Sequence, residues 1–202
     1  DLMEGGEGLA SVPGKEAEFA AALVECLSYV TSLGVKQVNV LPGRCFDDSK
    51  REQYLSTFKR NLNTAAQMFK PLGITVMFEA INTFDMPGFV IHNVDQMIDV
   101  IEDCEHENIK MQFDIYHMAR MEEGDVSAII SRLGAQIGHI QFADAPGRGE
   151  PGTGDLDFKS IFYAIEYSTY EGWVSAEYKP TKYTEETLRW KQFITSSLAM
   201  CS

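Results

Sequence analysis

The segment MQFDIYH, residues 111–117, is the part of the sequence that most clearly indicates the fold. Met111, Phe113 and Ile115 are apolar at alternating positions, which predicts a half-buried β-strand. Asp114 interrupts this pattern, and a carboxylate inside an apolar strand is costly unless it has a partner. The position of Asp114 therefore indicates a polar site close to the end of a buried strand.

Strand and helix patterns alternate on both sides of this segment. Apolar residues that recur three and four positions apart are typical of helices, and they separate short runs rich in β-branched and aromatic residues. The strict alternation predicts parallel strands joined by helical crossovers. The predicted strands are 36–43, 73–82, 109–117, 137–146 and 172–180, and the predicted helices contain residues 19–30, 55–69, 94–101, 126–133, 158–165 and 188–198.

The spacing of these patterns favours a barrel. One strand and its helix take about 30 residues, which matches a (β/α)8 TIM barrel of about 250 residues, although five strands are too few to close one. An open doubly wound sheet is the alternative, but no GxGxxG motif follows the first predicted strand. No low-complexity segment or linker divides the sequence, so we predict a single domain over residues 1–202.

The composition narrows the choice of partners. The 30 acidic and 17 basic residues give a net charge of −13, which disfavours binding to nucleic acid. No apolar run approaches the roughly 20 residues of a membrane span, and the acidic, glycine-rich start is unlike a signal peptide. The four cysteines show no CxxC spacing, so reduced thiols in a cytoplasmic protein are expected. A small-molecule substrate is the partner that remains.

A polar residue stands near the end of each of the last four predicted strands: Glu79, Asp114, Gln141 and Glu177. In a parallel barrel the carboxyl ends of the strands form the face where active sites are built. Three carboxylates and an amide offer only oxygen ligands, which suits a hard divalent cation such as Mg²⁺ or Mn²⁺. Any one acid could instead cap a helix or pair with Lys or Arg, but four at matching positions favour a joint site.

Three further residues are candidates for substrate binding: His117, Arg148 and Glu150. His117 either packs in the core against a backbone carbonyl or faces the pocket and donates to a substrate oxygen. The glycine-rich loop 144–155, DAPGRGEPGTGD, is not a phosphate-binding P-loop, because no GK[ST] follows. Its Arg148 suits the bidentate capture of a substrate carboxylate, with Glu150 nearby. The alternative is a flexible loop in which Arg148 and Glu150 pair with each other.

The segments FEAINT, QFDIYHM, FADAPGRGEPGTGD and GWVSAEYKP closely resemble the hydroxypyruvate isomerase family, whose members are xylose-isomerase-like TIM barrels. The resemblance covers essentially the whole chain, and RGEPGTGD is its most specific part. It implies the interconversion of hydroxypyruvate and 2-hydroxy-3-oxopropanoate (tartronate semialdehyde), with Glu79 and Glu177 as the proton donor and acceptor. The implied metal ligands are Glu79, Asp114, Gln141 and Glu177, with His117 and Arg148 in contact with the substrate.

The implied reaction fits these side chains. Moving a carbonyl group between adjacent carbons requires that a proton leave one carbon and return to the next. Two carboxylates beside the substrate can exchange the acceptor and donor roles, and a divalent ion would stabilise the enediolate intermediate. No organic cofactor is required.

The resemblance also implies strands that precede this sequence. Family members are eight-stranded barrels, whereas the chain is expected to retain strands 4–8, because residues 1–8 resemble the loop after the third strand. Roughly 60 residues are missing from the usual barrel length. The strands at 36–43 and 172–180 would then be exposed edges, which a homo-oligomer or a partner chain could cover.

Three other functions are the alternatives to this isomerase. A repair endonuclease of the same fold would need more histidines for several zinc ions and a basic groove, but the chain has four histidines and a charge of −13. A sugar epimerase would use a similar cluster, usually with histidine in place of Gln141. The third is a truncated barrel without activity that serves as a binding module.

Overall fold

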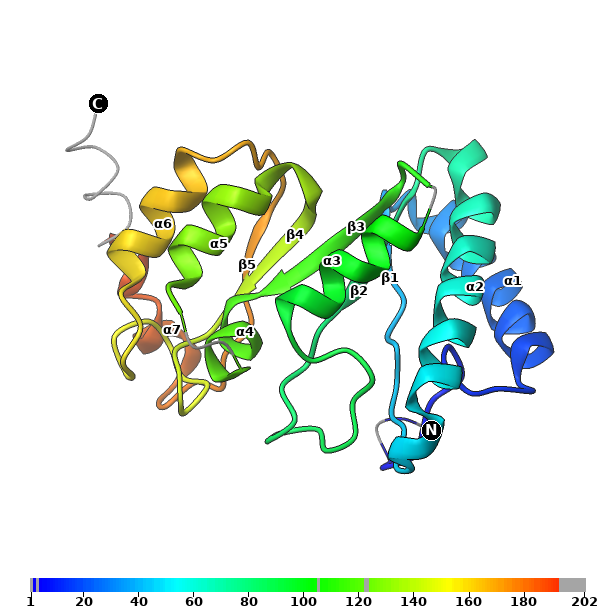
Figure 1. The fold of residues 1–202 in the computed structure, drawn as a ribbon. Helices are drawn as coiled ribbons and strands as arrows, with labels where there is room; N and C mark the ends of the chain where they lie inside the picture. Colours follow the sequence, from blue (N-terminus) through cyan, green and yellow to red (C-terminus); the bar gives the residue numbers. More distant parts are fainter. Residues whose placement is uncertain (1, 3, 105, 122–123, 193–202) are drawn as a thin grey trace. The chain divides into compact units, whose positions relative to one another are not determined.

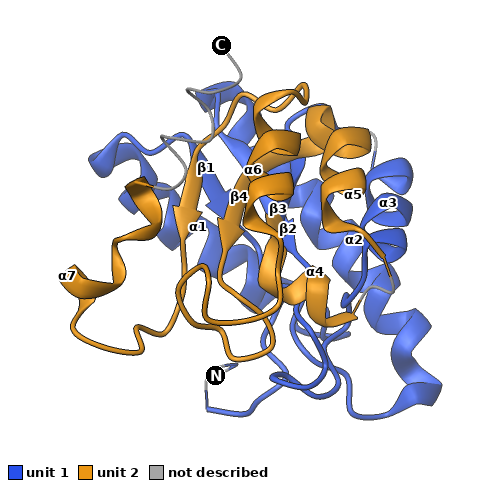
Figure 2. Cartoon of the chain, turned by 90° about the vertical axis from the view of Figure 1, so that its left-hand side faces the viewer, with its two compact units in different colours: residues 1–112 blue, residues 113–202 orange. Residues whose placement is uncertain are grey.

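The computed structural model describes residues 2, 4–104, 106–121 and 124–192 (Figure 1). The chain forms two compact units, residues 1–112 and 113–202 (Figure 2). The boundary falls inside one strand, β3 (Ile109–Asp114), so that the last two residues of this strand belong to the second unit. The prediction of a single domain over residues 1–202 stays a prediction.

The first unit is built from three parallel strands in chain order and the helices between them. Its registers pair Asn39 with Met77 and Glu79 with Gln112. The elements are α1 (Glu16–Leu33), β1 (Gln37–Asn39), α2 (Arg51–Phe69), β2 (Thr75–Glu79), α3 (Val94–Asp103) and β3, with short 3-10 helices at Asp48–Lys50 and Lys70–Leu72.

Aromatic packing between α2 and β2 forms the core of the first unit. Phe58 of α2 and Phe78 of β2 are both fully buried, and their rings meet edge to face with centroids 5.9 Å apart. Leu62 and Phe69 extend the same buried face of α2. The predicted apolar stripe of this helix is therefore the face that covers the strands.

The second unit continues the alternation with β4 and β5 as parallel neighbours. The Phe142 ring of β4 makes edge-to-face contacts with the rings of Phe162 and Trp190, at 5.3 and 5.1 Å between centroids. The elements are α4 (Ile115–Met121), α5 (Val126–Leu133), a 3-10 helix (Gly134–Gln136), β4 (Ile137–Phe142), α6 (Phe158–Glu166), β5 (Val174–Ala176) and α7 (Thr184–Thr187).

Side chains that bond to backbone N–H groups fix where the helices begin. The side chains of Asn93, Asp125 and Asp157 accept hydrogen bonds from the first turns of α3, α5 and α6, respectively. Such caps satisfy backbone donors that have no partner within the helix. The five predicted strands are all present, but each is shorter than predicted, above all because it ends earlier at its carboxyl end.

The prediction was wrong for the end of the strand 109–117. The strand stops at Asp114 and α4 begins at Ile115, so Ile115 and His117 are helical. The cause is local: Oδ1 of Asp114 accepts hydrogen bonds from the backbone nitrogens of Tyr116 at 2.8 Å and His117 at 3.5 Å. Asp114 is therefore the N-cap of α4.

The last predicted helix, 188–198, differs as well. α7 ends at Thr187, before the predicted stripe begins, and residues 190–192 are again helical. Residues 194 and 198 lie outside the described residues. Cys26, Cys45 and Cys104 are free thiols, and Cys201 also lies outside the described part. Within the described part no helix is long and apolar enough to cross a membrane.

Candidate functional site

Glu79 ends strand β2 and is buried. Its Oε2 atom accepts two hydrogen bonds from side-chain amides of the neighbouring strands. Gln112 Nε2 of β3 donates at 2.7 Å and Asn39 Nδ2 of β1 donates at 3.0 Å. The sequence reading identified Glu79 but not these two partners, because no residue pattern shows which side chains the strand register places beside it.

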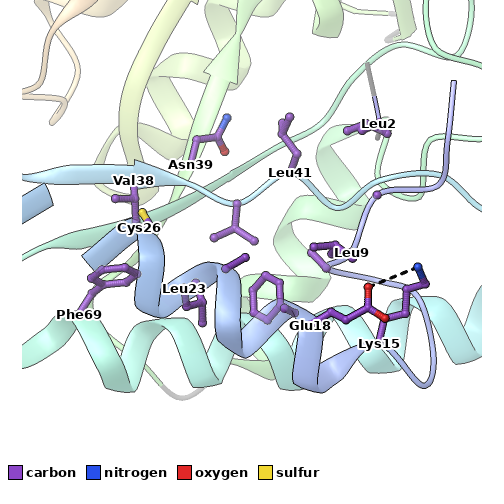
Figure 3. Close-up of a pocket in the computed structure, with 15 residues that line it drawn as sticks. Leu2, Leu9, Lys15, Glu18, Leu23, Cys26, Val38, Asn39, Leu41 and Phe69 are labelled. Carbon is purple, nitrogen blue, oxygen red and sulfur yellow. Dashed lines mark ion pairs between the residues drawn. The ribbon is translucent and has the colours of Figure 1, made fainter. Parts of the chain in front are cut away.

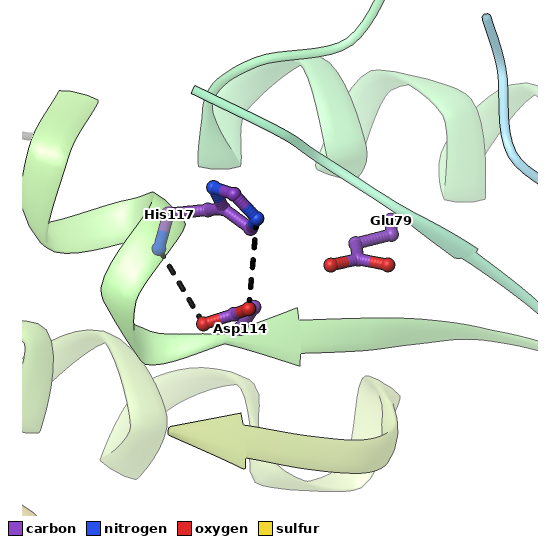
Figure 4. A group of neighbouring side chains, drawn as sticks. All are labelled: Glu79, Asp114 and His117. Atoms are coloured by element: carbon purple, nitrogen blue, oxygen red, sulfur yellow. Dashed lines mark hydrogen bonds and ion pairs between the residues drawn. The ribbon is translucent and has the colours of Figure 1, made fainter. Parts of the chain in front are cut away.

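Asp114 is the last residue of β3, belongs to the second unit and is only 1% exposed. While Oδ1 caps α4, Oδ2 accepts no hydrogen bond from any residue that the structure describes. Two cationic or potentially cationic side chains face Oδ2: His117 Nε2 at 3.6 Å and Arg148 Nη2 at 3.8 Å. Figure 4 draws both interactions between Asp114 and His117, together with Glu79 of β2.

The electrostatic environment of Asp114 is unusual. The pKa of its carboxyl group is raised to about 7, mainly by burial and also by the negative charge of Glu177, against the opposing effects of Arg148 and the capping N–H groups. Loss of water around a carboxylate disfavours its charged form. A cation bound at Oδ2 would therefore relieve an electrostatic cost that the protein side chains only partly offset.

Arg148 joins two of the candidate carboxylates within the second unit. Its Nη2 atom lies 3.2 Å from Glu177 Oε1, in addition to the longer contact with Asp114. The guanidinium carbon sits 5.0 Å from the ring centroid of Tyr116, a cation–π arrangement. Arg148 is the one non-glycine residue among those described with a positive φ, 57°. The loop thus holds this side chain in place between Tyr116 and the acids.

Asp144 organises this loop, and the sequence reading missed it. The residue is fully buried. Its Oδ2 accepts hydrogen bonds from the backbone nitrogens of Gly152 and Gly154, both at 2.8 Å, and its Oδ1 accepts one from Leu156 at 3.1 Å. The only available signal was an aspartate at a strand end ahead of a glycine-rich loop. Asp144 shapes the segment that carries Arg148.

Gln141 and Glu177 occupy one face of the pair β4 and β5. Gln141 pairs with Ser175, and the backbone nitrogen of Glu177 donates to the carbonyl of Phe142 at 2.9 Å. Alternate residues of a strand share a face, so Gln141, Ser175 and Glu177 project to the same side. Glu177 is 47% exposed on its side chain, much more open than Asp114.

His139 and Glu150 have surroundings that differ from those of Asp114 and Glu177. His139 shares the face of Gln141, and burial lowers its pKa while Glu177 opposes this effect. The carboxylate of Glu150 accepts hydrogen bonds from the backbone nitrogen and the hydroxyl group of Thr181. Arg148 forms its ion pairs with Asp114 and Glu177, so the alternative in which the loop is flexible and Arg148 pairs with Glu150 gains no support.

The donor set fits a hard divalent cation. Within the second unit, Asp114 and His117 are both buried, and each offers a metal-ligating atom. Oδ2 of Asp114 is the atom that a cation would most stabilise, since it is buried and accepts no hydrogen bond from the described residues, and its two ion-pair contacts are long. Oxygen ligands with one imidazole suit Mg²⁺, Mn²⁺ and Zn²⁺ alike. His117, which the sequence reading assigned to substrate binding, is thus also a candidate nitrogen ligand.

Alternating parallel strands and helices with acids at the strand ends define an enzyme of the TIM-barrel class. The family model described as xylose isomerase-like TIM barrel matches residues 3–192, and the chain belongs to this family. The resemblance stated from the sequence is therefore confirmed. The described residues contain five strands, fewer than the eight of a closed barrel.

Comparison with individual proteins points to isomerases. Hydroxypyruvate isomerase of Escherichia coli is 42% identical over 94% of this chain and 73% of its own length. A 2-oxo-tetronate isomerase of Cupriavidus necator is 36% identical with the same coverage. The crystal structure of an AP endonuclease, family 2, from Brucella melitensis superposes with a TM-score of 0.89 at 32% identity, over 95% of this chain and 74% of that one. The chain is an isomerase of this superfamily, of the aldose–ketose type.

Proposed function

We propose that the chain interconverts hydroxypyruvate and 2-hydroxy-3-oxopropanoate. The observation that carries the proposal is the buried Asp114, whose Oδ2 lacks a hydrogen bond among the described residues and faces Arg148. A buried carboxylate oxygen that accepts no hydrogen bond and lies near a guanidinium suits a metal-assisted reaction on a substrate that itself carries a carboxylate. The name of the Escherichia coli relative supports the choice of substrate.

We propose that Glu79, Asp114, Gln141 and Glu177 hold one divalent ion, Mg²⁺ or Mn²⁺. All four stand at the carboxyl ends of strands or directly after them. An ion held by these residues would supply Lewis-acid stabilisation of the negative charge that develops on the substrate oxygens. No nicotinamide, flavin or pyridoxal cofactor is needed for this chemistry.

In the proposed mechanism the two glutamates move the proton. One carboxylate takes a proton from C3 of hydroxypyruvate and the protonated partner glutamate gives one to C2, while the proton of the C3 hydroxyl passes to the C2 oxygen. The two glutamates then exchange protons with water to regain their starting states, and their roles are reversed in the opposite direction. Arg148 binds the substrate carboxylate through its guanidinium fork. His117 donates to a substrate oxygen, and Glu150 contributes a further contact from the same loop as Arg148.

Other substrates define the alternatives. The relative from Cupriavidus necator is a 2-oxo-tetronate isomerase, so a substrate one carbon longer is the first to compare. A ketose epimerase of the same superfamily and an inactive binding module come next. A nucleic-acid substrate, which the name of the Brucella melitensis protein raises, is disfavoured by the excess of 30 acidic over 17 basic residues. A cytoplasmic location and a homo-oligomer remain parts of the proposal.

The test is a substrate panel with metal-free protein to which Mg²⁺ or Mn²⁺ is added back. Proton NMR follows the conversion of hydroxypyruvate, 2-oxo-tetronate and ketoses. We expect hydroxypyruvate to turn over only with metal, and we expect Glu79→Gln and Glu177→Gln to lower kcat by about 100-fold or more. Glu171→Gln, at an exposed glutamate ahead of β5, is the matched control. Full activity of both site variants would refute the mechanism with two glutamates.

A further inference from the structure

The side chains of Gln112 and Asn39 have no role in the proposed mechanism, but both donate hydrogen bonds to the carboxylate of Glu79. We infer that Gln112 and Asn39 are positioning residues, which fix the orientation of the Glu79 carboxylate for its proposed work as ligand and proton carrier. This inference rests on the proposed function and deepens it. All three residues lie in the first unit.

The strand register explains why these side chains meet. Gln112 is the direct cross-strand neighbour of Glu79, and Asn39 is paired with Met77, which stands two residues before Glu79 in β2. Paired residues and alternate residues of parallel strands project to the same face. Three adjacent strands thus direct Asn39, Glu79 and Gln112 to one side of the sheet, with the glutamate in the middle.

The bonds are asymmetric with respect to the carboxylate. Both amide nitrogens donate to Oε2, at 2.7 and 3.0 Å. An ionised carboxylate can only accept hydrogen bonds, so each amide must turn its NH₂ group toward it. Two donors that converge on one oxygen from opposite strands fix the rotation of the carboxylate plane. The direction in which Oε1 points is then set by the sheet.

The two donors have different surroundings. Gln112 is only 8% exposed, so water cannot readily replace its amide. Asn39 is exposed and lines a cavity of about 610 Å³, mostly apolar, between α1, β1 and residues 8–10 (Figure 3). Water entering from this side can take over the Asn39 hydrogen bond when the side chain is removed. Loss of Gln112 should therefore disturb Glu79 more than loss of Asn39.

The test compares Gln112→Met, which keeps the side-chain length but removes the donor, with Asn39→Ala, at an exposed position that tolerates truncation. Binding of Mn²⁺ to the metal-free protein is measured by electron paramagnetic resonance, without substrate. Residues that orient a metal ligand typically contribute 10–100-fold in affinity or activity. We expect the Mn²⁺ dissociation constant to rise by about this factor in Gln112→Met and less in Asn39→Ala. With hydroxypyruvate, kcat should fall more than KM changes.

Phe78→Leu is the matched structural control. Phe78 lies in the same strand on the opposite face, where it packs against Phe58, so this change destabilises β2 without touching the amide bonds. It should leave the Mn²⁺ affinity of the folded protein unchanged.

Wild-type affinity in both Gln112→Met and Asn39→Ala would overturn the inference, as would a loss in Phe78→Leu equal to that in Gln112→Met. If the wild type binds Mn²⁺ but does not convert hydroxypyruvate, the proposed substrate fails while the Mn²⁺ titration still decides the positioning role. A wild type that binds neither Mn²⁺ nor Mg²⁺ overturns both.

Discussion

Asp144→Asn tests how the loop that carries Arg148 is held. The native carboxylate accepts three backbone hydrogen bonds, from Gly152, Gly154 and Leu156. Asparagine has nearly the same shape but only one accepting oxygen. If that oxygen takes the place of Oδ2, the NH₂ group faces the N–H of Leu156, and two donors are directed at each other.

The expected magnitude follows from these bonds. A hydrogen bond to a charged group contributes about 1.5–3 kcal/mol and a neutral one about 0.5–1.5 kcal/mol. The variant loses one charge-assisted bond and weakens two others to neutral strength, so we expect a loss of about 3.5–6 kcal/mol in the free energy of unfolding. With a urea m-value of about 2 kcal/mol per molar, the midpoint shifts by about 2–3 M.

Tryptophan fluorescence is a suitable assay, because both tryptophans of the chain, Trp173 and Trp190, belong to the second unit. Urea unfolding followed by this signal therefore reports on the unit that contains Asp144. The control is Asp155→Asn, at an exposed aspartate in the same loop, which should change the stability by less than about 0.5 kcal/mol. If the two variants unfold at the same urea concentration, the role assigned to Asp144 is wrong.

Two further predictions concern pH and the core. Because burial raises the pKa of Asp114 to about 7, the folded protein holds a proton that the unfolded chain releases near pH 4, so the stability of the metal-free protein should fall as the pH rises through this window. Cations bind the ionised form, so the increase in Tm caused by Mg²⁺ should grow from about pH 5.5 to about pH 8. A constant increase in differential scanning fluorimetry would contradict this. Phe58→Ala, at a fully buried ring, should cost about 3–5 kcal/mol by circular dichroism in urea, whereas Phe84→Ala, at a ring 65% exposed, should cost far less.

The order of the elements could be predicted because each helix and strand carries its own apolar period. The ends of the elements could not. Strand β3 stops where the side chain of Asp114 bonds to the next backbone nitrogens, and α6 begins where Asp157 does the same. These bonds depend on a side-chain conformation, which the alternation of apolar residues does not reveal.

The residues of the candidate site likewise fall into those that the sequence could identify and those that it could not. Glu79, Asp114 and Glu177 could be selected from the sequence, because an acid at the end of an apolar strand is conspicuous. Gln112 and Asn39 could not, because their contact with Glu79 depends on the register of three strands. Asp144 was missed because its donors lie 8, 10 and 12 residues away in a loop without periodicity.

The two oxygens of Asp114 have a consequence for how substitutions at this position are understood. Oδ1 starts α4, while Oδ2 faces Arg148 and His117. Asparagine would preserve the start of the helix and remove the charge, whereas glutamate would preserve the charge and, being one methylene longer, would misplace the cap. Only aspartate meets both demands, so folding and chemistry select the same side chain for separate reasons.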